Sequence, residues 1–315
     1  MPRSTLFLLL FLLALATPAR AGEAPEAKAL AYLAREVPRW SAEHRCFSCH
    51  NNGDAARALY AGIRMGREVP LQATADTDAW LARPEGWDRN GGDGPFSDKV
   101  LARVQFAAAL ASAVGAGRVR DRAALARAAA RLAEGQAEDG SWPVDEQGPV
   151  GSPATYGRPL ATWMALETLR AADSARFRPR IDRAAAWLRR LEPANIPDAS
   201  VLLLVLAGEE TSMGSGRAAL DLLRRGQSPD GGWGPFATSA PEAFDTALAL
   251  LALDRHRARP GVSALIARGR ASLAATRRDD GSWAETTRPA DGESYAQRLS
   301  TTGWATLALL TVPAP

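Results

Sequence analysis

Several residue types are scarce in this 315-residue sequence, and each scarcity excludes a class of protein. Two cysteines are too few for the disulfide framework that stabilises small secreted domains. The 38 basic residues are nearly balanced by 35 acidic ones, so the chain carries no strong electrostatic footprint for nucleic acid or an anionic membrane. No apolar run beyond Leu6–Ala16 approaches the length of a transmembrane helix. We therefore expect no nucleic-acid partner and no membrane span after the N-terminal segment.

The two cysteines lie in the motif Cys46-Phe47-Ser48-Cys49-His50. This C-x-x-C-H spacing is the attachment signature of c-type haem. In that chemistry the two thiols form thioethers with the haem vinyl groups, and the adjacent imidazole is the proximal iron ligand. The motif therefore predicts one covalent haem c, attached through Cys46 and Cys49, with His50 on the iron.

Two other interpretations of the motif stay open. His44 could complete a four-ligand zinc set with the motif, although consecutive Cys49 and His50 make simultaneous chelation awkward. The cysteines could instead form a redox disulfide, but such C-x-x-C pairs usually belong to a thioredoxin-like βαβ unit, which is absent from this pattern. Zinc is thus the alternative cofactor.

The N-terminus has the features of a secretory signal peptide. Arg3 supplies a positive n-region, Leu6–Ala16 is an apolar h-region too short to span a bilayer, and Ala19-Arg20-Ala21 fits a cleavage site. We therefore expect residues 1–21 to be removed, leaving residues 22–315 as a periplasmic or secreted protein. Export agrees with the motif, because haem c is normally attached after export, and it implies a periplasmic redox partner.

Internal repeats give the second strong signal. Gln136–Trp142 (QAEDGSW) recurs as Gln227–Trp233 (QSPDGGW) and again as Arg277–Trp283 (RRDDGSW). Asp-Gly is turn chemistry, because glycine is free to take positive φ and aspartate can bond nearby backbone. The Trp that follows is predicted to be a large wedge between neighbouring units. Each turn follows an amphipathic stretch and precedes an almost wholly apolar one.

Amphipathic and apolar stretches alternate along the chain and predict six helix pairs. An amphipathic helix exposes one side to solvent, whereas a helix that is apolar all round must be enclosed. Six of each predict two concentric rings in one domain, the outer ring amphipathic and the inner ring buried. The expected outer helices are 27–39, 71–81, 122–134, 179–191, 216–225 and 263–276. The expected inner helices are 53–65, 96–114, 160–169, 198–207, 243–253 and 302–310.

In such a ring, every turn from an outer to an inner helix lies on the same rim. The C-x-x-C-H, in the loop of the first pair at residues 40–52, therefore shares its rim with the Asp-Gly-Trp turns. Two long loops on this rim, 143–159 and 284–297, predict a mouth over the haem and the central cavity. The rim offers His44 and Met164 as a sixth iron ligand, although core packing is the commoner role of such a methionine. The alternative is a five-coordinate or water-ligated iron.

The Gln-x-x-Asp-Gly-Ser/Gly-Trp elements resemble the QW repeats of squalene–hopene cyclases and related prenyltransferases. The resemblance covers nearly the whole chain after residue 21 and implies an all-α (α/α)6 toroid of six helical hairpins. It also implies a central cavity that could hold an apolar small molecule. Function belongs to sites rather than to folds, so the activity has to be argued from individual residues.

The acid motif of these cyclases, D-x-D-D, is incomplete here. The nearest strings are Asp76-Thr77-Asp78-Ala79 and Phe244-Asp245-Thr246-Ala247, and Asp245 is the candidate catalytic acid because it starts an inner helix. Its other role would be an N-terminal carboxylate stabilised by the helix dipole. Carbocation chemistry needs an aromatic pocket, and Tyr and Phe are few. A prenyltransferase zinc site needs a cysteine, and both are committed elsewhere. We therefore expect no squalene cyclase activity.

Two hypotheses for function follow. The leading one is an exported c-type haem protein with a redox or small-ligand-binding role on a squalene-cyclase-like toroid. The alternative is a toroid without haem that binds a lipid, isoprenoid or glycan in its central cavity, or an enzyme that acts on such a substrate.

Overall fold

The computed structural model describes residues 24–89, 98–144, 150–208, 214–288 and 290–314, so the predicted signal segment lies outside the described residues. Within these ranges the chain is helical, and its one extended pairing is an isolated bridge. The α-helices are α1 (Pro25–His44), α2 (Ala56–Arg64), α3 (Ala75–Leu81), α4 (Lys99–Gly115), α5 (Arg122–Glu134), α6 (Gly157–Asp173), α7 (Arg178–Arg189), α8 (Ile196–Val205), α9 (Gly214–Gly226), α10 (Ala243–Asp254), α11 (Val262–Thr276) and α12 (Tyr295–Thr311). The shorter elements are a π-helical segment, η1 (Cys49–Ala55), and two 3-10 helices, η2 (Leu71–Ala73) and η3 (Pro84–Arg89).

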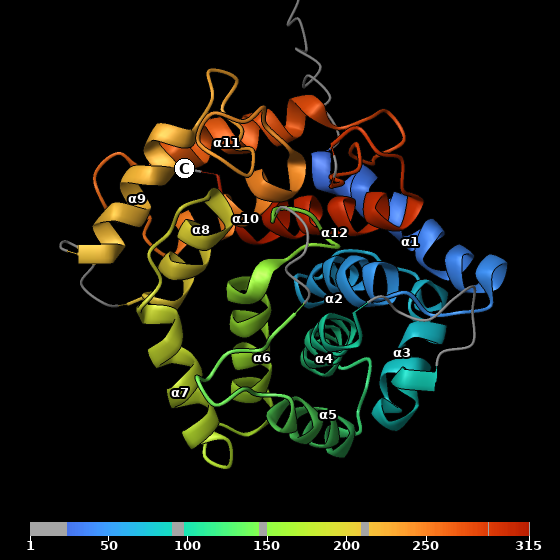
Figure 1. The fold of residues 1–315 in the computed structure, drawn as a ribbon. Coiled ribbons are helices and arrows are strands. Elements are labelled where there is room, and N and C mark those ends of the chain that lie inside the picture. Colours follow the sequence, from blue (N-terminus) through green and yellow to red (C-terminus); the bar gives the residue numbers. More distant parts are fainter. Residues whose placement is uncertain (1–23, 90–97, 145–149, 209–213, 289, 315) are drawn as a thin grey trace, which may run out of the picture.

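The helices form two concentric rings (Figure 1). The even-numbered helices form the inner ring, in which each packs against the next and α12 returns to η1 and α2. The odd-numbered helices lie outside and pack against the inner ones. The predicted fold class, an all-α toroid of the (α/α)6 type, is confirmed. Among the described residues, no helix is long and apolar enough to cross a membrane.

Burial explains why these helices are inside. Inner helices α8 and α10 are apolar on every side, and Val201–Leu203 and Ala247–Leu250 are inaccessible to solvent. Outer helix α9, by contrast, buries Leu223 on one face and exposes Arg217 on another. A helix without a polar face is stable only when it is enclosed, so the amphipathic helices cover the apolar ones and keep their own charges in water.

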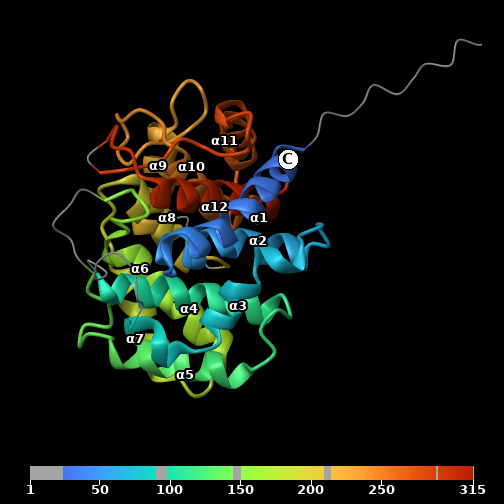
Figure 2. The same cartoon turned by 90° about the vertical axis from the view of Figure 1, so that its right-hand side faces the viewer.

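Outer-to-inner connections and return connections lie on opposite rims of the toroid (Figure 2). The loops after α5 and α11 lie on one side, and the connections after α2 and α4 lie on the other. The turn after α1, which carries the C-x-x-C-H motif, belongs to the first of these rims. The expected placement of the motif on the rim of the Asp-Gly-Trp turns is therefore found.

The three Asp-Gly-Trp turns are built alike. Trp142, Trp233 and Trp283 are almost completely buried, and each indole Nε1 donates to the carbonyl ten residues earlier, at 2.8–2.9 Å. Each Trp backbone N–H donates to a threonine hydroxyl of the next inner helix. The glycine of each turn has φ between 94° and 100°, and a Cβ there would meet a backbone carbonyl of another outer helix at 2.4–2.6 Å. Each turn therefore joins three helices.

The helix ends lie within four residues of the expected ones except at two boundaries. α1 continues to His44 rather than residue 39, because Pro38 is accommodated within the helix. α12 begins at Tyr295 rather than 302, because the Ser294 hydroxyl accepts the N–H of Gln297 and caps the helix. The expected loops 40–52 and 284–297 are therefore shorter, since the helices extend into polar sequence that the apolar pattern does not reach.

Truncation of Trp233 to alanine should destabilise the protein strongly. The change leaves a cavity where three helices meet, so we expect a loss of about 3–5 kcal/mol in the free energy of unfolding. Denaturant unfolding followed by circular dichroism measures this loss. Phe236→Ala is the matched control, because Phe236 is 43% exposed and should contribute little. Equal stability of Trp233→Ala and the wild type would contradict the role of Trp233 as a wedge.

Candidate functional site

The C-x-x-C-H motif spans the turn between α1 and η1. α1 ends where Arg45 takes a left-handed conformation with φ 50°, and η1 begins at Cys49. The last two residues of the motif are therefore already helical. The Ser48 hydroxyl caps this segment by accepting the N–H of His50 at 3.2 Å. π-helical turns are rare and occur frequently at functional sites.

Cys49 and His50 lie side by side. Sγ of Cys49 is 3.5 Å from Nδ1 of His50, and the cysteines are not joined in a disulfide. Burial, reinforced by the charge of Asp54, raises the pKa of the Cys49 thiol to about 12. Burial also lowers the pKa of His50, although the charge of Asp54 opposes this effect. Nε2 of His50 is buried and has no hydrogen-bond partner among the described residues.

Aromatic side chains flank the motif on both sides. Phe47 stacks on Trp80 with ring centroids 4.6 Å apart, and Trp80 packs edge-on against Phe106. On the other side, His44 stacks on Trp40 at 4.1 Å. Within the part of the chain that the structure describes, no three His, Cys, Asp or Glu side chains form a group that could hold a metal ion. The four residues of the alternative zinc set are therefore not brought together there.

A buried carboxylate that the sequence analysis missed lies near the end of η1. Asp54 accepts three hydrogen bonds, from the Tyr156 hydroxyl at 2.5 Å, the Ser300 hydroxyl at 2.6 Å and the Gln105 amide at 2.8 Å. Trp304 donates to the Tyr156 hydroxyl at 3.0 Å. Burial raises the pKa of Tyr156 well above its ordinary value, so its hydroxyl keeps its proton and donates. We call these five residues the Asp54 node.

No local pattern could have revealed the Asp54 node. Its members come from η1, α4, α12 and the residue before α6, so they are far apart in the sequence. The one signal in the sequence was the position of Asp54, an acid beside Gly53 at the start of the predicted inner helix 53–65. The node therefore emerges only when the ring closes.

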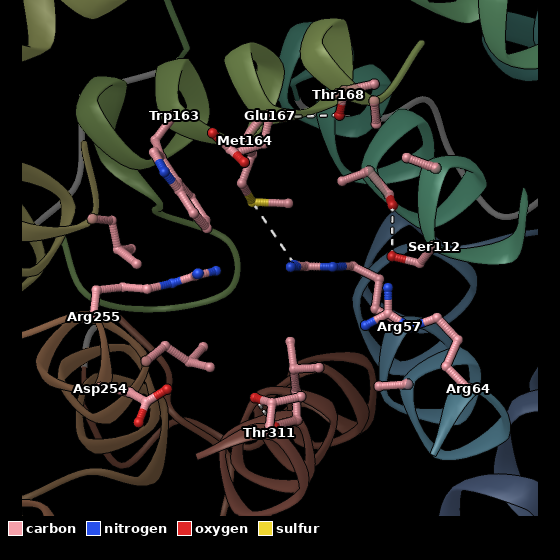
Figure 3. Close-up of a pocket in the computed structure, with 17 residues that line it drawn as sticks. Arg57, Arg64, Ser112, Trp163, Met164, Glu167, Thr168, Asp254, Arg255 and Thr311 are labelled. Atoms are coloured by element: carbon pink, nitrogen blue, oxygen red, sulfur yellow. Dashed lines mark hydrogen bonds between the residues drawn. The ribbon is translucent and has the colours of Figure 1, made fainter. Parts of the chain in front are cut away.

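A central cavity of about 460 Å³ lies inside the inner ring, and every inner helix contributes to its wall (Figure 3). Met164, a candidate iron ligand, lies in this wall with Sδ 3.9 Å from Nη1 of Arg57. The Arg57 guanidinium also lies 4.6 Å from the ring centroid of Trp304, and its Nη1 is 3.8 Å from Oδ1 of Asp54. The Asp54 node is therefore adjacent to Arg57, behind the cavity wall.

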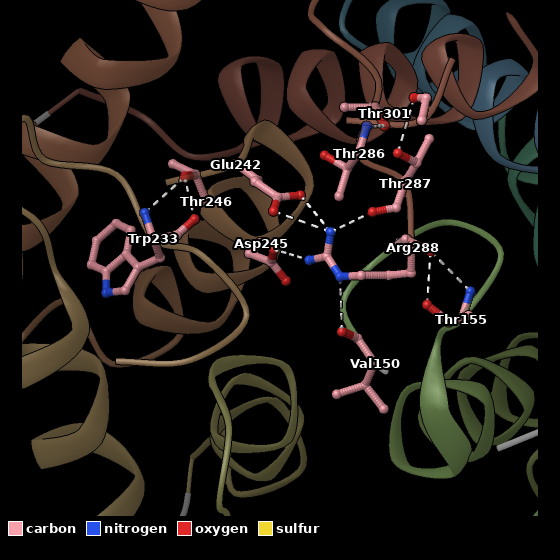
Figure 4. Close-up of polar contacts among 12 residues, drawn as sticks. Val150, Thr155, Trp233, Glu242, Asp245, Thr246, Thr286, Thr287, Arg288 and Thr301 are labelled. Atoms are coloured by element: carbon pink, nitrogen blue, oxygen red, sulfur yellow. Dashed lines mark hydrogen bonds and ion pairs between the residues drawn. The ribbon is translucent and has the colours of Figure 1, made fainter. Parts of the chain in front are cut away.

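Asp245 lies in the first turn of α10, as expected, but in a separate cluster (Figure 4). It is completely buried, and its Oδ2 is 3.5 Å from Nη2 of Arg288. Arg288 also donates to both carboxylate oxygens of Glu242 and to the Val150 carbonyl. Burial, followed by the charge of Glu242, raises the pKa of Asp245 well above its ordinary value, while Arg288 opposes the shift. Asp245 does not line the central cavity.

The sequence predicted a mouth over the haem and the central cavity on this rim, but the loop before α12 instead lines a groove of about 610 Å³ with α10 and α11. Glu285 in this groove is bound by Arg298 through two hydrogen bonds of 2.9 Å, which lower the pKa of Glu285 to about 2. None of the residues described in its wall also lines the central cavity. The groove is therefore a surface feature, separate from the cavity.

Comparisons with known proteins bear on the fold. No family model and no curated protein matches the sequence. The type II terpene cyclase MstE from Scytonema is similar in structure, with 13% identity and a TM-score of 0.60 over 91% of this chain and 97% of MstE. A protein from Actinoplanes is 17% identical, with a TM-score of 0.57 over 90% of this chain and 98% of that one.

A further similar structure is the ent-copalyl diphosphate synthase from Streptomyces platensis. It is 22% identical, with a TM-score of 0.52, and the match covers 82% of this chain and 50% of the synthase. The fold of this chain is thus that of the terpenoid cyclases. At these identities the likeness shows the fold alone.

Replacement of Asp245 by asparagine should change how stability depends on pH. A carboxyl whose pKa is higher in the folded protein than in the unfolded chain binds more protons when folded, so stability falls as the pH rises above about 4. Asp245→Asn lacks this loss, and its stability relative to the wild type should increase from pH 4 towards neutral pH. Urea unfolding at several pH values measures the trend.

The exposed Asp76 provides the matched control, and Asp76→Asn should show no such trend. Parallel pH profiles for Asp245→Asn and the wild type would contradict the raised pKa of Asp245.

Proposed function

We propose that this chain is an exported c-type haem protein built on a terpenoid-cyclase-like toroid. Cys46 and Cys49 would form the thioethers, and His50 would ligate the iron through Nε2. The observation that carries the proposal is this buried Nε2, which lacks a partner in the described chain although leaving a buried polar atom unpaired costs free energy. Bound haem supplies redox chemistry or the binding of a small ligand.

The surroundings of the motif fit a haem. The sulfur of Cys49 is buried beside the His50 ring, a position that suits a neutral thioether. The stacked rings of Phe47 and Trp80 offer an apolar, aromatic neighbour to a porphyrin. The stacking of His44 on Trp40 speaks against the zinc alternative, because zinc would need His44 to turn towards the cysteines.

The redox-disulfide alternative has less support. Reactive cysteines lie in electropositive and partly exposed surroundings. Cys49 is instead buried, and the neighbouring charge that acts on it is the carboxylate of Asp54. Export through residues 1–21, a periplasmic or secreted location and a periplasmic redox partner belong to the haem proposal.

The two candidates for the sixth iron ligand are both engaged elsewhere. His44 is stacked on Trp40, and Met164 lies in the wall of the central cavity beside Arg57. α6, which carries Met164, packs against α4 and α8, whereas η1 packs against α4 and α12. We therefore propose that neither residue would bind the iron, and a haem held by His50 alone would suit small-ligand binding or redox chemistry more than simple electron transfer.

Haem should stay attached during denaturing electrophoresis of the full chain exported by a host with haem c maturation machinery. In-gel peroxidase staining and a pyridine haemochrome spectrum measure the attachment. The double variant Cys46→Ser/Cys49→Ser should lose the haem band, because both thioethers are gone. His44→Ala, the matched control, should keep it. A stoichiometric zinc content without Soret absorbance, lost in His44→Ala, would refute the haem proposal in favour of zinc.

The ferric protein should also change its absorption spectrum when imidazole or cyanide is added. The reason is the open coordination position inferred from the placement of His44 and Met164. Met164→Ala should respond as the wild type does. If neither imidazole nor cyanide changed the absorption spectrum of the wild type, but both changed that of Met164→Ala, Met164 would be identified as the sixth ligand.

The central cavity favours a second candidate function, the binding of an apolar small molecule. Its volume of about 460 Å³ lies in the range of small-molecule sites. A variant of the terpene cyclase MstE, 13% identical with a TM-score of 0.57, was solved in complex with geranylgeranyl dihydroxybenzoate. The ligand here would be a lipid, isoprenoid or glycan, or the substrate of an enzyme. Squalene cyclisation is not proposed, because the D-x-D-D motif is incomplete and Asp245 lies outside the cavity wall.

A further inference from the structure

We propose that the central cavity binds an amphiphile with an anionic head, a carboxylate or a phosphate, through Arg57, Arg64 and Arg255. The proposal rests on the second candidate function and names the chemistry of its ligand, and it is independent of haem. Figure 3 shows the three arginines at the cavity, two from α2 and one from the end of α10.

The charges of the cavity wall do not balance. Two acids, Glu167 and Asp254, also line the cavity, but each is bound by an arginine that does not line it. Glu167 accepts a hydrogen bond from Arg170 at 2.6 Å, and Asp254 is 2.9 Å from a guanidinium nitrogen of Arg257. The lining arginines at the ends of α2 and α10 form no ion pair with a carboxylate of the described chain. The wall therefore carries positive charge that no carboxylate of the wall balances.

Arg57 is the decisive residue of the three. Its side chain is only 12% exposed, and its nearest carboxylate, Asp54, is 3.8 Å away and already accepts three hydrogen bonds. Its one hydrogen-bond partner among the described residues is the sulfur of Met164 at 3.9 Å, a weak acceptor. The ring of Trp304, 4.6 Å away, and the distant Asp54 stabilise the charge but provide no hydrogen bond to an oxygen, and a nearly buried guanidinium that lacks such bonds costs free energy. An anionic head in the cavity would satisfy it.

Helix-end stabilisation accounts for the other two arginines but not for Arg57, whose structural contacts are Asp54 at 3.8 Å and the ring of Trp304. Arg64 is the last residue of α2, and Arg255 follows the last residue of α10, where helix carbonyls stabilise a cation. Arg57 lies near the middle of the continuous helical segment 49–64. The dipole effect is confined to the last turn, so it does not reach this position.

The rest of the cavity wall is largely apolar, which favours a ligand with an apolar chain. Ala61, Ala108, Trp163, Leu204 and Leu251 are among the residues that line the cavity. A glycan would leave many hydroxyl groups unpaired against such side chains, and a neutral lipid would leave the guanidinium of Arg57 without an oxygen that accepts a hydrogen bond. An amphiphile with one anionic head satisfies both parts of the wall.

The test is isothermal titration of the purified full chain with three probes of equal chain length, the two anions below their critical micelle concentrations and the alcohol below its solubility limit. The probes are dodecanoate, dodecyl phosphate and dodecanol. We expect one anion to bind per chain, with dodecanol at least about tenfold weaker because charge-assisted hydrogen bonds are lost. The tighter of the two anions distinguishes a carboxylic acid from a phosphate ester as the source of the head.

Arginine variants test which side chain binds the anionic head of the probes. Arg57→Gln should weaken both anionic probes at least about tenfold and leave dodecanol unchanged, because only the charged contact is lost. Arg57→Lys should recover part of the anion affinity. Arg217→Gln, on the outer helix α9 with a side chain 72% exposed, is the matched control and should bind as the wild type does. Should Arg57→Gln not fold, Arg255→Gln takes its place and should weaken both anionic probes, though less than Arg57→Gln would, while leaving dodecanol unchanged.

Four outcomes would overturn the proposal. Equal affinity for dodecanol and the anions, or Arg57→Gln binding anions as the wild type does, would disprove the anion site while leaving cavity binding intact. Arginine variants that lose thermal stability without any change in affinity would show a structural role only. Binding of no probe would refute both the anion site and the second candidate function, and the haem proposal would be unaffected.

Discussion

The whole toroid depends on closure of the ring between its last and first helix pairs. α12 approaches η1 so closely that a Cβ on Gly303 would lie 2.6 Å from Cα of Ala55, so glycine is required there. The last Asp-Gly turn makes the matching outer contact, because Gly281 lies against the backbone of Lys28 in α1. If these ends did not meet, inner helices without a polar face would be exposed to water. Closure therefore decides whether the apolar sequence can fold at all.

The same closure positions both candidate sites. Asp54 follows His50 by four residues and precedes Arg57 by three, so one helical segment carries all three side chains past the contact with α12. The charge of Asp54 acts on the pKa of His50 on one side and lies 3.8 Å from Arg57 on the other. A buried carboxylate is costly unless its oxygens are hydrogen-bonded, which explains why three neutral donors converge on it.

The sequence predicts those parts of the structure whose information is local. An Asp-Gly-Trp turn lies within seven residues and an apolar helix within a dozen, so the rings, the turns and the burial of Trp233 could be inferred. The partners of Asp54 come from positions 105, 156 and 300, and a lone acid in a helix has no distinctive pattern. Asp245 was visible because it starts an apolar helix, but its partner Arg288 lies on a distant loop. The observed helix ends differ from the expected ones where a polar capping residue such as Ser294, rather than the apolar pattern, determines where the helix begins.

The two proposed sites occupy different parts of one ring. The C-x-x-C-H motif lies on the rim of outer-to-inner turns, whereas two of the cavity arginines lie at the opposite ends of α2 and α10. The Asp54 node separates them, and none of its residues lines the cavity. A cofactor on the rim and a ligand in the centre would therefore not compete for space. The one residue near both sites is Asp54, whose carboxylate is held by neutral hydrogen-bond donors. Because these bonds need neither haem nor cavity ligand, loss of function at either site would leave the ring closed.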